Sequence, residues 1–281
     1  MFIDVALRDV EPTTLMASRL LLAAVILLPL LMLQLGARSA LRALRREAWG
    51  GSVLGIVAAA LPFTLIAWGQ THVDSAVAAI ANASMPIFVV LLAYRFRPSE
   101  RPSGLRLFGV FLGLTGVAVL AGGEPSGGLW AVLGTLAVVL AAFSYAAGAL
   151  YAQHRLGGAT GPVISTAQSI AGALILLPFG LAQLPDHWPT WKPLASILAL
   201  GVAGTAIGTL LYYKIVSDYG ASRASLVVYL LPPFAVFYGV TLLSEPLTVP
   251  EVVGMILVLT GVALGSGLLR LARRETAPAR G

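Results

Sequence analysis

The chain has 281 residues, of which 58% are hydrophobic and 11% are charged, whereas a typical soluble domain carries about 25% charged residues. This composition indicates a polytopic membrane protein, and the absence of cysteine excludes disulfides, thiolate catalysis and cysteine-ligated metals. The net charge of +6 does not indicate a nucleic-acid partner, because the arginines stand in short runs between apolar stretches rather than on one basic face.

The apolar stretches, taken in chain order, are long enough to cross a bilayer, which requires about 20 residues. They begin near residues 12, 49, 73, 104, 128, 161, 193, 221 and 250. They predict nine full transmembrane helices in an all-α integral membrane protein. The breaks carry turn residues, such as RFRPSERPSG at 95–104, and none could hold a soluble domain.

The basic residues predict the orientation, because lysine and arginine are enriched on the cytoplasmic side of a membrane. With nine helices and GARSALRALRRE facing the cytoplasm, 15 of the 18 basic residues fall on that side. Only Arg8 and Lys192 fall opposite, and Arg19 lies inside a span. We therefore expect a bacterial inner-membrane protein with a cytoplasmic C-terminus.

Internal similarity divides the chain into two repeats. VILLPL at 25–30 recurs as LILLPF at 174–179, SAVAAIANASMPIF from Ser75 resembles SRASLVVYLLPPFA from Ser222, and FGVFLGLTGVAVL from Phe108 resembles VGMILVLTGVALG from Val253. The offsets are 149, 147 and 145, which predicts two five-helix units, residues 1–123 and 124–281. An odd number of helices inverts the second unit relative to the first, an arrangement typical of secondary transporters.

The opening residues MFIDVALRDVEPTTL match only the end of the second unit's first helix. We expect them to be the end of a first helix whose front, about 20 residues, is missing. A start codon further upstream and a truncated ten-helix protein are both compatible with this pattern.

Three segments resemble a known family: DVEPTTLMASRLLLAAVILL, SAVAAIANASMPIFVVLLA and the long stretch from YGASRASLVVYLLPPF to VLTGVAL. They are similar to the drug/metabolite transporter superfamily, specifically the EamA-domain permeases. The resemblance implies ten helices, a central cavity reached alternately from either side, and transport of small metabolites. The chain departs from the family pattern at the start of helix one and at Glu100, which stands two residues late in the first repeat.

The charged side chains do not indicate an enzyme. None of the 12 carboxylates lies in the middle of a span, and three scattered histidines cannot form a metal site. The sequence has no Walker loop, so we expect no cofactor and transport that is secondary rather than ATP-driven.

The repeat also predicts the residues of a substrate cavity. At the offset of 147, Asn82 corresponds to Tyr229 and Pro86 to Pro233. Asn82 and Tyr229 each lie about 12 to 13 Å into a span from opposite sides, near the midplane. Ser225 shares a helix face with Tyr229, as Pro86 does with Asn82. The alternative is that Asn82 bonds a neighbouring helix and Tyr229 packs.

Tyr212 and Ser144 complete the candidate cavity, although a core or interfacial role for Tyr212 is an alternative. Arg19 and its repeat counterpart Gln168 are candidates for gating or charge pairing. Arg19 lies about 10 Å below the outer surface, where it could bind a substrate anion, snorkel, or pair with Asp4.

Glycine pairs four residues apart predict close helix packing, with a homodimer seam as an alternative. These pairs are Gly51 with Gly55, Gly109 with Gly113, and Gly261 with Gly265. We expect a transporter that binds lipid and a small molecule, and the rival interpretation is a non-transporting scaffold or an inactive truncated paralogue.

Overall fold

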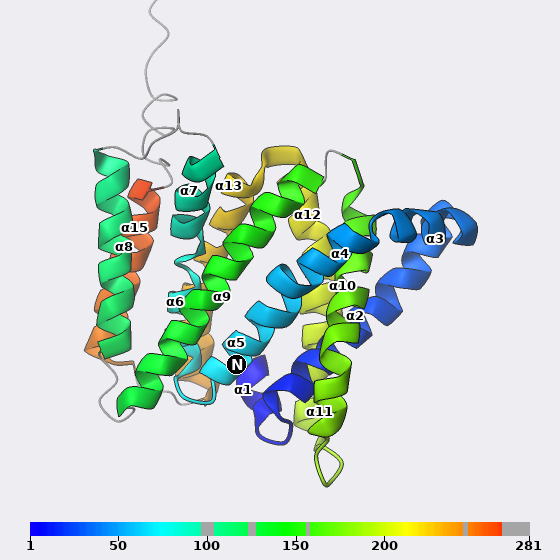
Figure 1. Ribbon diagram of the computed structural model, residues 1–281. Coiled ribbons are helices and arrows are strands. Elements are labelled where there is room, and N and C mark those ends of the chain that lie inside the picture. The colour runs from blue at the N-terminus through cyan, green and yellow to red at the C-terminus, as the bar shows by residue number, and fades with distance from the viewer. Residues whose placement is uncertain (97–103, 123–127, 156–157, 244–246, 266–281) are drawn as a thin grey trace, which may run out of the picture.

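A computed structural model describes residues 1–96, 104–122, 128–155, 158–243 and 247–265, and its secondary structure over these ranges is entirely helical. Figure 1 shows the helices as one bundle, with α9 crossing the front and α8 and α15 side by side at one edge. Glu100 and the segment around it lie outside the described residues.

The first half of the chain contains nine elements. They are α1 (Phe2–Leu7), α2 (Pro12–Leu35), α3 (Ala37–Arg46), α4 (Ala48–Gly55), the π-helical turn η1 (Ile56–Ala60), α5 (Leu61–Gly69), α6 (Ser75–Asn82), α7 (Met85–Phe96) and α8 (Leu105–Gly122). Gly36 separates α2 from α3 with a φ of 78°, which only glycine adopts without strain.

The second half begins with a longer helix than the first half does. It contains α9 (Gly128–Arg155), α10 (Gly161–Ala182), α11 (Trp191–Ala199), the π-helical turn η3 (Leu200–Ile207), α12 (Gly208–Tyr219), α13 (Ala221–Ala224), the 3-10 turn η4 (Ser225–Leu230), α14 (Leu231–Tyr238), the π-helical turn η5 (Gly239–Leu243) and α15 (Val249–Gly265). Gly220, with a φ of 84°, makes the sharp turn between α12 and α13.

The predicted spans can be compared with these helices by length and composition. Among the described residues, seven continuous helices are long and apolar enough to cross a membrane. The two remaining predicted spans, from residues 104 and 250, correspond to shorter apolar helices, Leu107–Leu120 and Val249–Gly265. The prediction of an all-α, multi-pass membrane protein is therefore confirmed, with seven of the nine spans reaching full length.

Glycines bring α8 and α15 into backbone contact. A Cβ at Gly109 would lie 2.5 Å from the Gly261 carbonyl oxygen, and a Cβ at Gly116 would lie 2.9 Å from that of Gly254. The two helices are antiparallel, since the earlier residue of one meets the later residue of the other. The predicted role of Gly109 and Gly261 in packing within the bundle is confirmed here.

The second helices of the two halves, α2 and α10, also pack antiparallel. Thr14 donates a hydrogen bond to the carbonyl of Gly180 at 2.9 Å, at one end of the contact. Leu31 packs with Val163 in a buried cluster at the other end. Gly51 and Gly55 of α4 approach α10 as well, where added Cβ atoms would lie 2.6 Å from the Cβ of Ala167 and 2.7 Å from that of Ala171.

Most of the described basic side chains outside the spans gather at one end of the bundle. Figure 1 places α3, with its four arginines, at the same end as the turn between α12 and α13, which is flanked by Lys214 and Arg223. The opposite end carries Arg8 after α1 and Lys192 at the start of α11.

This distribution predicts that the α3 end faces the cytoplasm. Ser39 on α3 and Asp186 in the segment before α11 are both exposed, at opposite ends of the bundle. We expect Asp186→Cys to react with an impermeant thiol reagent added to intact cells, and Ser39→Cys to react only after permeabilisation. The reverse labelling pattern would contradict the orientation.

Candidate functional site

A polar contact joins α2 of the first half to the π-helical turn η3 of the second half. The Nε of Arg19 donates a hydrogen bond of 2.6 Å to the Thr205 hydroxyl. Thr205 in turn donates to the carbonyl of Leu200 at 2.8 Å, so its lone pair is left to accept from Arg19. The guanidinium also stacks on Phe63 of α5, with its central carbon 3.9 Å from the ring centroid.

An equivalent contact lies on the other side of the bundle. Gln168 of α10 donates from Nε2 to the carbonyl of Ala58, in the π-helical turn η1 of the first half, at 3.5 Å. At the repeat offsets of 149 and 147, Gln168 corresponds to Arg19 and Thr205 corresponds to Ala58. Thus each second helix reaches the π-helical turn of the opposite half, and π-helical turns are frequent at functional sites.

Pro62 explains why the turn η1 accepts side-chain hydrogen bonds. Proline has no N–H, so Pro62 cannot donate to the carbonyls four and five residues earlier, those of Ala58 and Val57. Gln168 donates to the first and the Ser144 hydroxyl to the second, at 2.6 Å. Ser144 therefore stabilises η1 from α9, and its only hydroxyl proton is already donated there.

Three tyrosines lie beside this network. Tyr213 is buried and donates to Oε1 of Gln168, and its ring lies 5.6 Å from that of Tyr212. The Tyr212 hydroxyl is buried and has no hydrogen-bond partner in the described part of the chain. Tyr145 of α9 packs on Phe63 at 6.1 Å between ring centroids. Tyr213 is thus part of the core, whereas the buried Tyr212 hydroxyl is left without a partner among the described residues.

Asn82 ends α6 at a break in the third predicted span. The helix resumes at Met85 as α7, with the buried Pro86 in its first turn and Ser84 donating to the carbonyl of Ala81 at 2.7 Å. The Oδ1 of Asn82 is buried without a hydrogen-bond partner among the described residues. This oxygen thus forms no hydrogen bond to a neighbouring helix among the described residues, and both interpretations of Asn82 stay predictions.

The corresponding span of the second half is irregular at the same place. Ser225 is buried and donates to the carbonyl of Ser222 at 2.9 Å, where the 3-10 turn η4 begins. The backbone of Tyr229 lies in η4, but its side chain is outside the described residues. Whether Asn82 and Tyr229 share a cavity stays a prediction.

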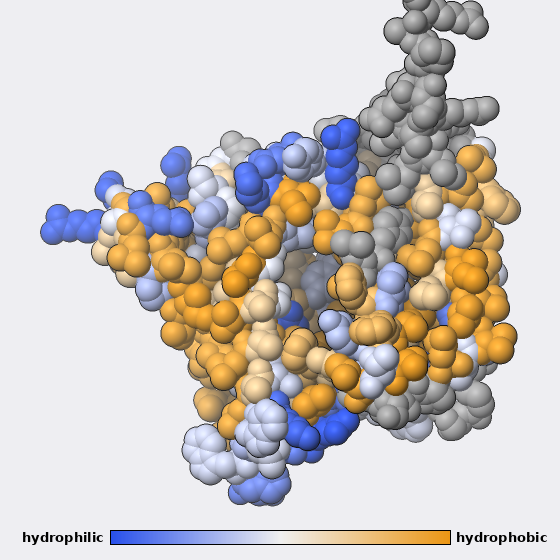
Figure 2. Space-filling view, turned by 180° about the vertical axis from the view of Figure 1, so that it is seen from behind, coloured by the Kyte–Doolittle hydropathy of each residue, from blue (hydrophilic) through white to orange (hydrophobic). Residues whose placement is uncertain are grey.

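A hollow opens on the face opposite to that of Figure 1. Figure 2 shows it near the centre of this face, with hydrophilic atoms at its floor and hydrophobic atoms on both sides. A hydrophilic floor inside an otherwise apolar surface is the arrangement expected of a transport pathway through a bilayer.

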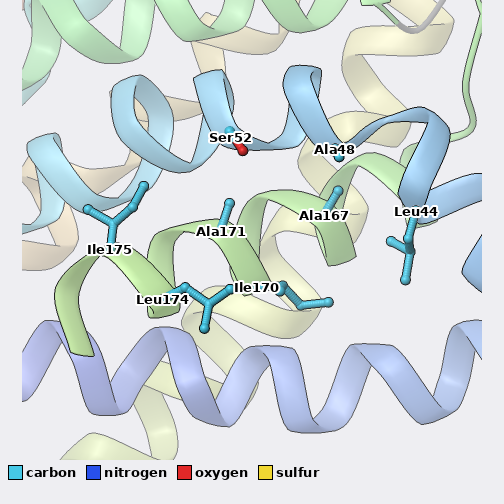
Figure 3. Close-up of a pocket in the computed structure, with 8 residues that line it drawn as sticks. All are labelled: Leu44, Ala48, Ser52, Ala167, Ile170, Ala171, Leu174 and Ile175. Carbon is cyan, nitrogen blue, oxygen red and sulfur yellow. The ribbon is translucent and has the colours of Figure 1, made fainter. Parts of the chain in front are cut away.

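A second, apolar pocket has a different character. It has a volume of about 290 Å³ and lies between α3, α4 and α10 (Figure 3). Seven of its eight lining residues are apolar, and Ser52 is the exception. It contains none of the predicted site residues, and its lining suits a hydrocarbon chain better than a polar metabolite.

The predicted pairing of Arg19 with Asp4 is wrong. Asp4 instead forms an ion pair with Arg8 at 3.3 Å, one turn later in the chain. In the residues that the structure describes, Arg19 has no acidic partner at all. The sequence reasoning also missed Thr205, Phe63 and Tyr145, since neither their type nor their spacing marks them. The repeat offers one signal for Thr205. Arg19 corresponds to Gln168, and Ala58, to which Gln168 donates, corresponds to Thr205.

The fold and these interior polar contacts define a class of protein, a multi-pass helical membrane protein with polar contacts between its helices. A family model described as the EamA-like transporter family matches residues 1–122 and 132–267. The chain belongs to this family, as the resemblance in its sequence predicted, and it is a membrane transporter by family.

Relatives and a solved structure agree with this membership. The chain is 30% identical to an "Uncharacterized transporter" of Archaeoglobus fulgidus over 74% of both chains. It is 31% identical to a "Probable terminal-alkyne amino-acid exporter" of Streptantibioticus cattleyicolor, over 75% of this chain and 68% of that protein. A crystal structure at 19% identity matches 98% of this chain and 95% of its own with a TM-score of 0.67, which supports the fold.

Proposed function

We propose that the chain is a secondary exporter of small metabolites in a bacterial inner membrane, which works by alternating access between two inverted repeats. The reciprocal contact between α8 and α15 supports the inversion. Gly109 corresponds to Gly254 and Gly116 to Gly261 at the offset of 145, and the observed contacts join Gly109 with Gly261 and Gly116 with Gly254. Such exchange of partners is expected about a two-fold axis.

The observation that carries the proposal is the pair of polar contacts at the two π-helical turns. Arg19 with Thr205 and Gln168 with Ala58 occupy equivalent positions, and each joins one repeat to the other. Weak polar contacts of this kind can break and re-form when two halves rock against each other. A packed apolar interface of the same extent would resist this movement more strongly.

The direction of transport is proposed from the printed names of relatives, including the exporter from Streptantibioticus cattleyicolor. The proposed cavity is lined by polar or irregular positions near the centre of the spans: Asn82, Pro86, Ser144, Tyr212, Ser225 and Tyr229. Of these, Asn82 and Tyr212 each hold a buried oxygen that lacks a partner among the described residues. An unpartnered buried oxygen is costly, so a polar ligand that bonds to it is favoured.

Replacing Asn82 with leucine tests this function. We expect inside-out vesicles that contain the Asn82→Leu protein to accumulate radiolabelled phenylalanine and phenylacetate at least about fivefold more slowly than wild type, because one ligand hydrogen bond is lost. Expression and thermal stability should change little, since no hydrogen bond to a described residue is removed.

Vesicles without the protein give the background, and the exposed Thr115→Val on α8 provides a control in which only a hydrogen bond to its own helix is lost. Wild-type uptake equal to the background would favour the non-transporting scaffold. An Asn82→Leu protein that fails to fold would favour an interhelical role for the amide.

A further inference from the structure

Arg19 is the only charged residue inside the predicted spans, and it is turned toward the bundle interior. Its partners lie on α5 and η3, on opposite halves of the chain, rather than at the end of a helix. A charge at this depth is expensive unless it is paired or faces water, and intramembrane charges commonly mark the path of a substrate.

The protein supplies no counter-charge to Arg19 within the part of the chain that the structure describes. Three of the described carboxylates are paired elsewhere: Asp4 with Arg8, Glu47 with Arg155, and Asp218 with Lys214. The other described carboxylates make no contact with Arg19 either. No described carboxylate therefore neutralises this guanidinium, which leaves it able to pair with the negative charge of a ligand.

The geometry of Arg19 leaves one end of the guanidinium free. A guanidinium has five N–H donors, and only the Nε–H is used, by Thr205. One face of the plane is stacked on Phe63. The two terminal nitrogens have no partner among the described residues, and part of the side chain remains accessible. Such a fork matches the two oxygens of a carboxylate.

Thr205 and Phe63 hold this fork in place before a ligand arrives. The Thr205 hydroxyl is fixed by its own bond to Leu200, so it accepts from Nε in one direction only. Phe63 is in turn held by the Tyr145 ring, which lies 6.1 Å away between centroids. The same two aromatic rings form an apolar wall beside the charge.

From these contacts we propose that Arg19 binds the carboxylate of the transported molecule, and that this molecule is a monocarboxylate with an apolar or aromatic body. This deepens the proposed function and rests on it. A single guanidinium balances one negative charge, which favours a monocarboxylate over a phosphate dianion. The aromatic wall of Phe63 and Tyr145 accommodates the apolar part.

The test compares phenylacetate with phenylacetamide, which has a similar shape but no charge. Purified protein in liposomes should move phenylacetate at least about tenfold faster than the amide at low concentration, since a charge-assisted bidentate contact is lost with the amide. Arg19→Gln should abolish this preference while transport of the amide continues. Arg19→Lys keeps the charge without the fork, so it should retain part of the preference.

The control is Arg42→Gln, which also removes one positive charge. Arg42 is exposed on α3 and, among the described residues, bonds only to Arg38 and Ser39 of its own helix, so the preference should be unchanged. As a readout without transport, phenylacetate should raise the melting temperature of the wild-type protein more than phenylacetamide or inorganic phosphate does. This measurement uses only the wild-type protein, so it does not depend on whether a variant folds.

The outcomes separate this inference from the proposed function. If the wild-type protein transports none of phenylacetate, phenylacetamide and phenylalanine, the proposed transport function is overturned. If wild type and Arg19→Gln move both compounds with the same ratio, transport stands and the carboxylate assignment is overturned. Equal loss of both compounds in a folded Arg19→Gln protein, or equal stabilisation by phosphate, would also overturn it.

Discussion

Replacing Gly261 with alanine is expected to lower the free energy of unfolding by about 3 kcal/mol, at the upper end of the range for overpacked cores. A Cβ at Gly261 would lie 2.6 Å from the carbonyl oxygen of Gly109 and would also collide with the backbone nitrogen of Gly113. Both obstacles are backbone atoms, so no side chain can rotate away and α15 must move from α8. Gly261→Val should be worse and should reduce the yield of folded protein.

The measurement is unfolding of the purified protein in mixed micelles with increasing sodium dodecyl sulfate. Gly208→Ala is the matched control, because its added Cβ would meet only the carbonyl of Ala203 at 3.4 Å, an ordinary contact. We expect that control to be neutral or slightly stabilising, since alanine favours helix more than glycine does. Equal effects of the two substitutions would contradict the close approach of α8 and α15.

Breaking the ion pair between Glu47 and Arg155 is expected to have the next largest effect on stability. The Nη2 of Arg155 lies 2.5 Å from Oε2 of Glu47, and the pair joins the junction of α3 and α4 to the end of α9. The Glu47 side chain is only 10% exposed, whereas that of Arg155 is 30% exposed. Glu47→Gln should therefore cost about 1 to 2 kcal/mol, less than for a fully buried pair because solvent reaches the arginine.

The exposed pair Lys214 with Asp218 is the control within the same chain. Its side chains are 73% and 43% exposed, so Asp218→Asn should change stability by less than about 0.5 kcal/mol. A double-mutant cycle with Glu47→Gln and Arg155→Gln should give a coupling energy close to the stability lost in Glu47→Gln alone. Independent, additive effects of the two substitutions would show that the pair does not contribute as a unit.

The carboxyl of Asp9 attaches the segment ahead of α2 to the segment ahead of α11, at the end of the bundle away from α3. It accepts hydrogen bonds from the backbone N–H of Thr190 at 2.8 Å and from the Thr190 hydroxyl at 2.7 Å. These bonds lower the pKa of Asp9 below its usual range. The attachment is thus complete at neutral pH and weakens only in acid, below the ordinary pKa of an aspartate.

The sequence by itself determined the class of the protein, and it predicts a division into two repeats. Apolar stretches of membrane length, the short runs of basic residues between them, and three internal similarities are local or periodic features that no packing detail can hide. Glycines at 109, 113 and 261 predicted close packing of their helices, because small residues in a membrane helix allow the backbones to approach each other. The family membership followed from the same segments.

Only the tertiary structure decided which polar groups meet. Arg19 was visible in the sequence, but its bond to Thr205 spans 186 residues and its stacking on Phe63 joins a third helix. The pairing of Asp4 with Arg8 rather than Arg19 depends on where α1 ends and α2 begins. Ser144 and Gln168 donate to two carbonyls that Pro62 cannot donate to, because proline has no N–H. The two donors come from helices far along the chain. Partners of this kind are set by the packing of helices in space, which a single sequence does not encode in its spacing.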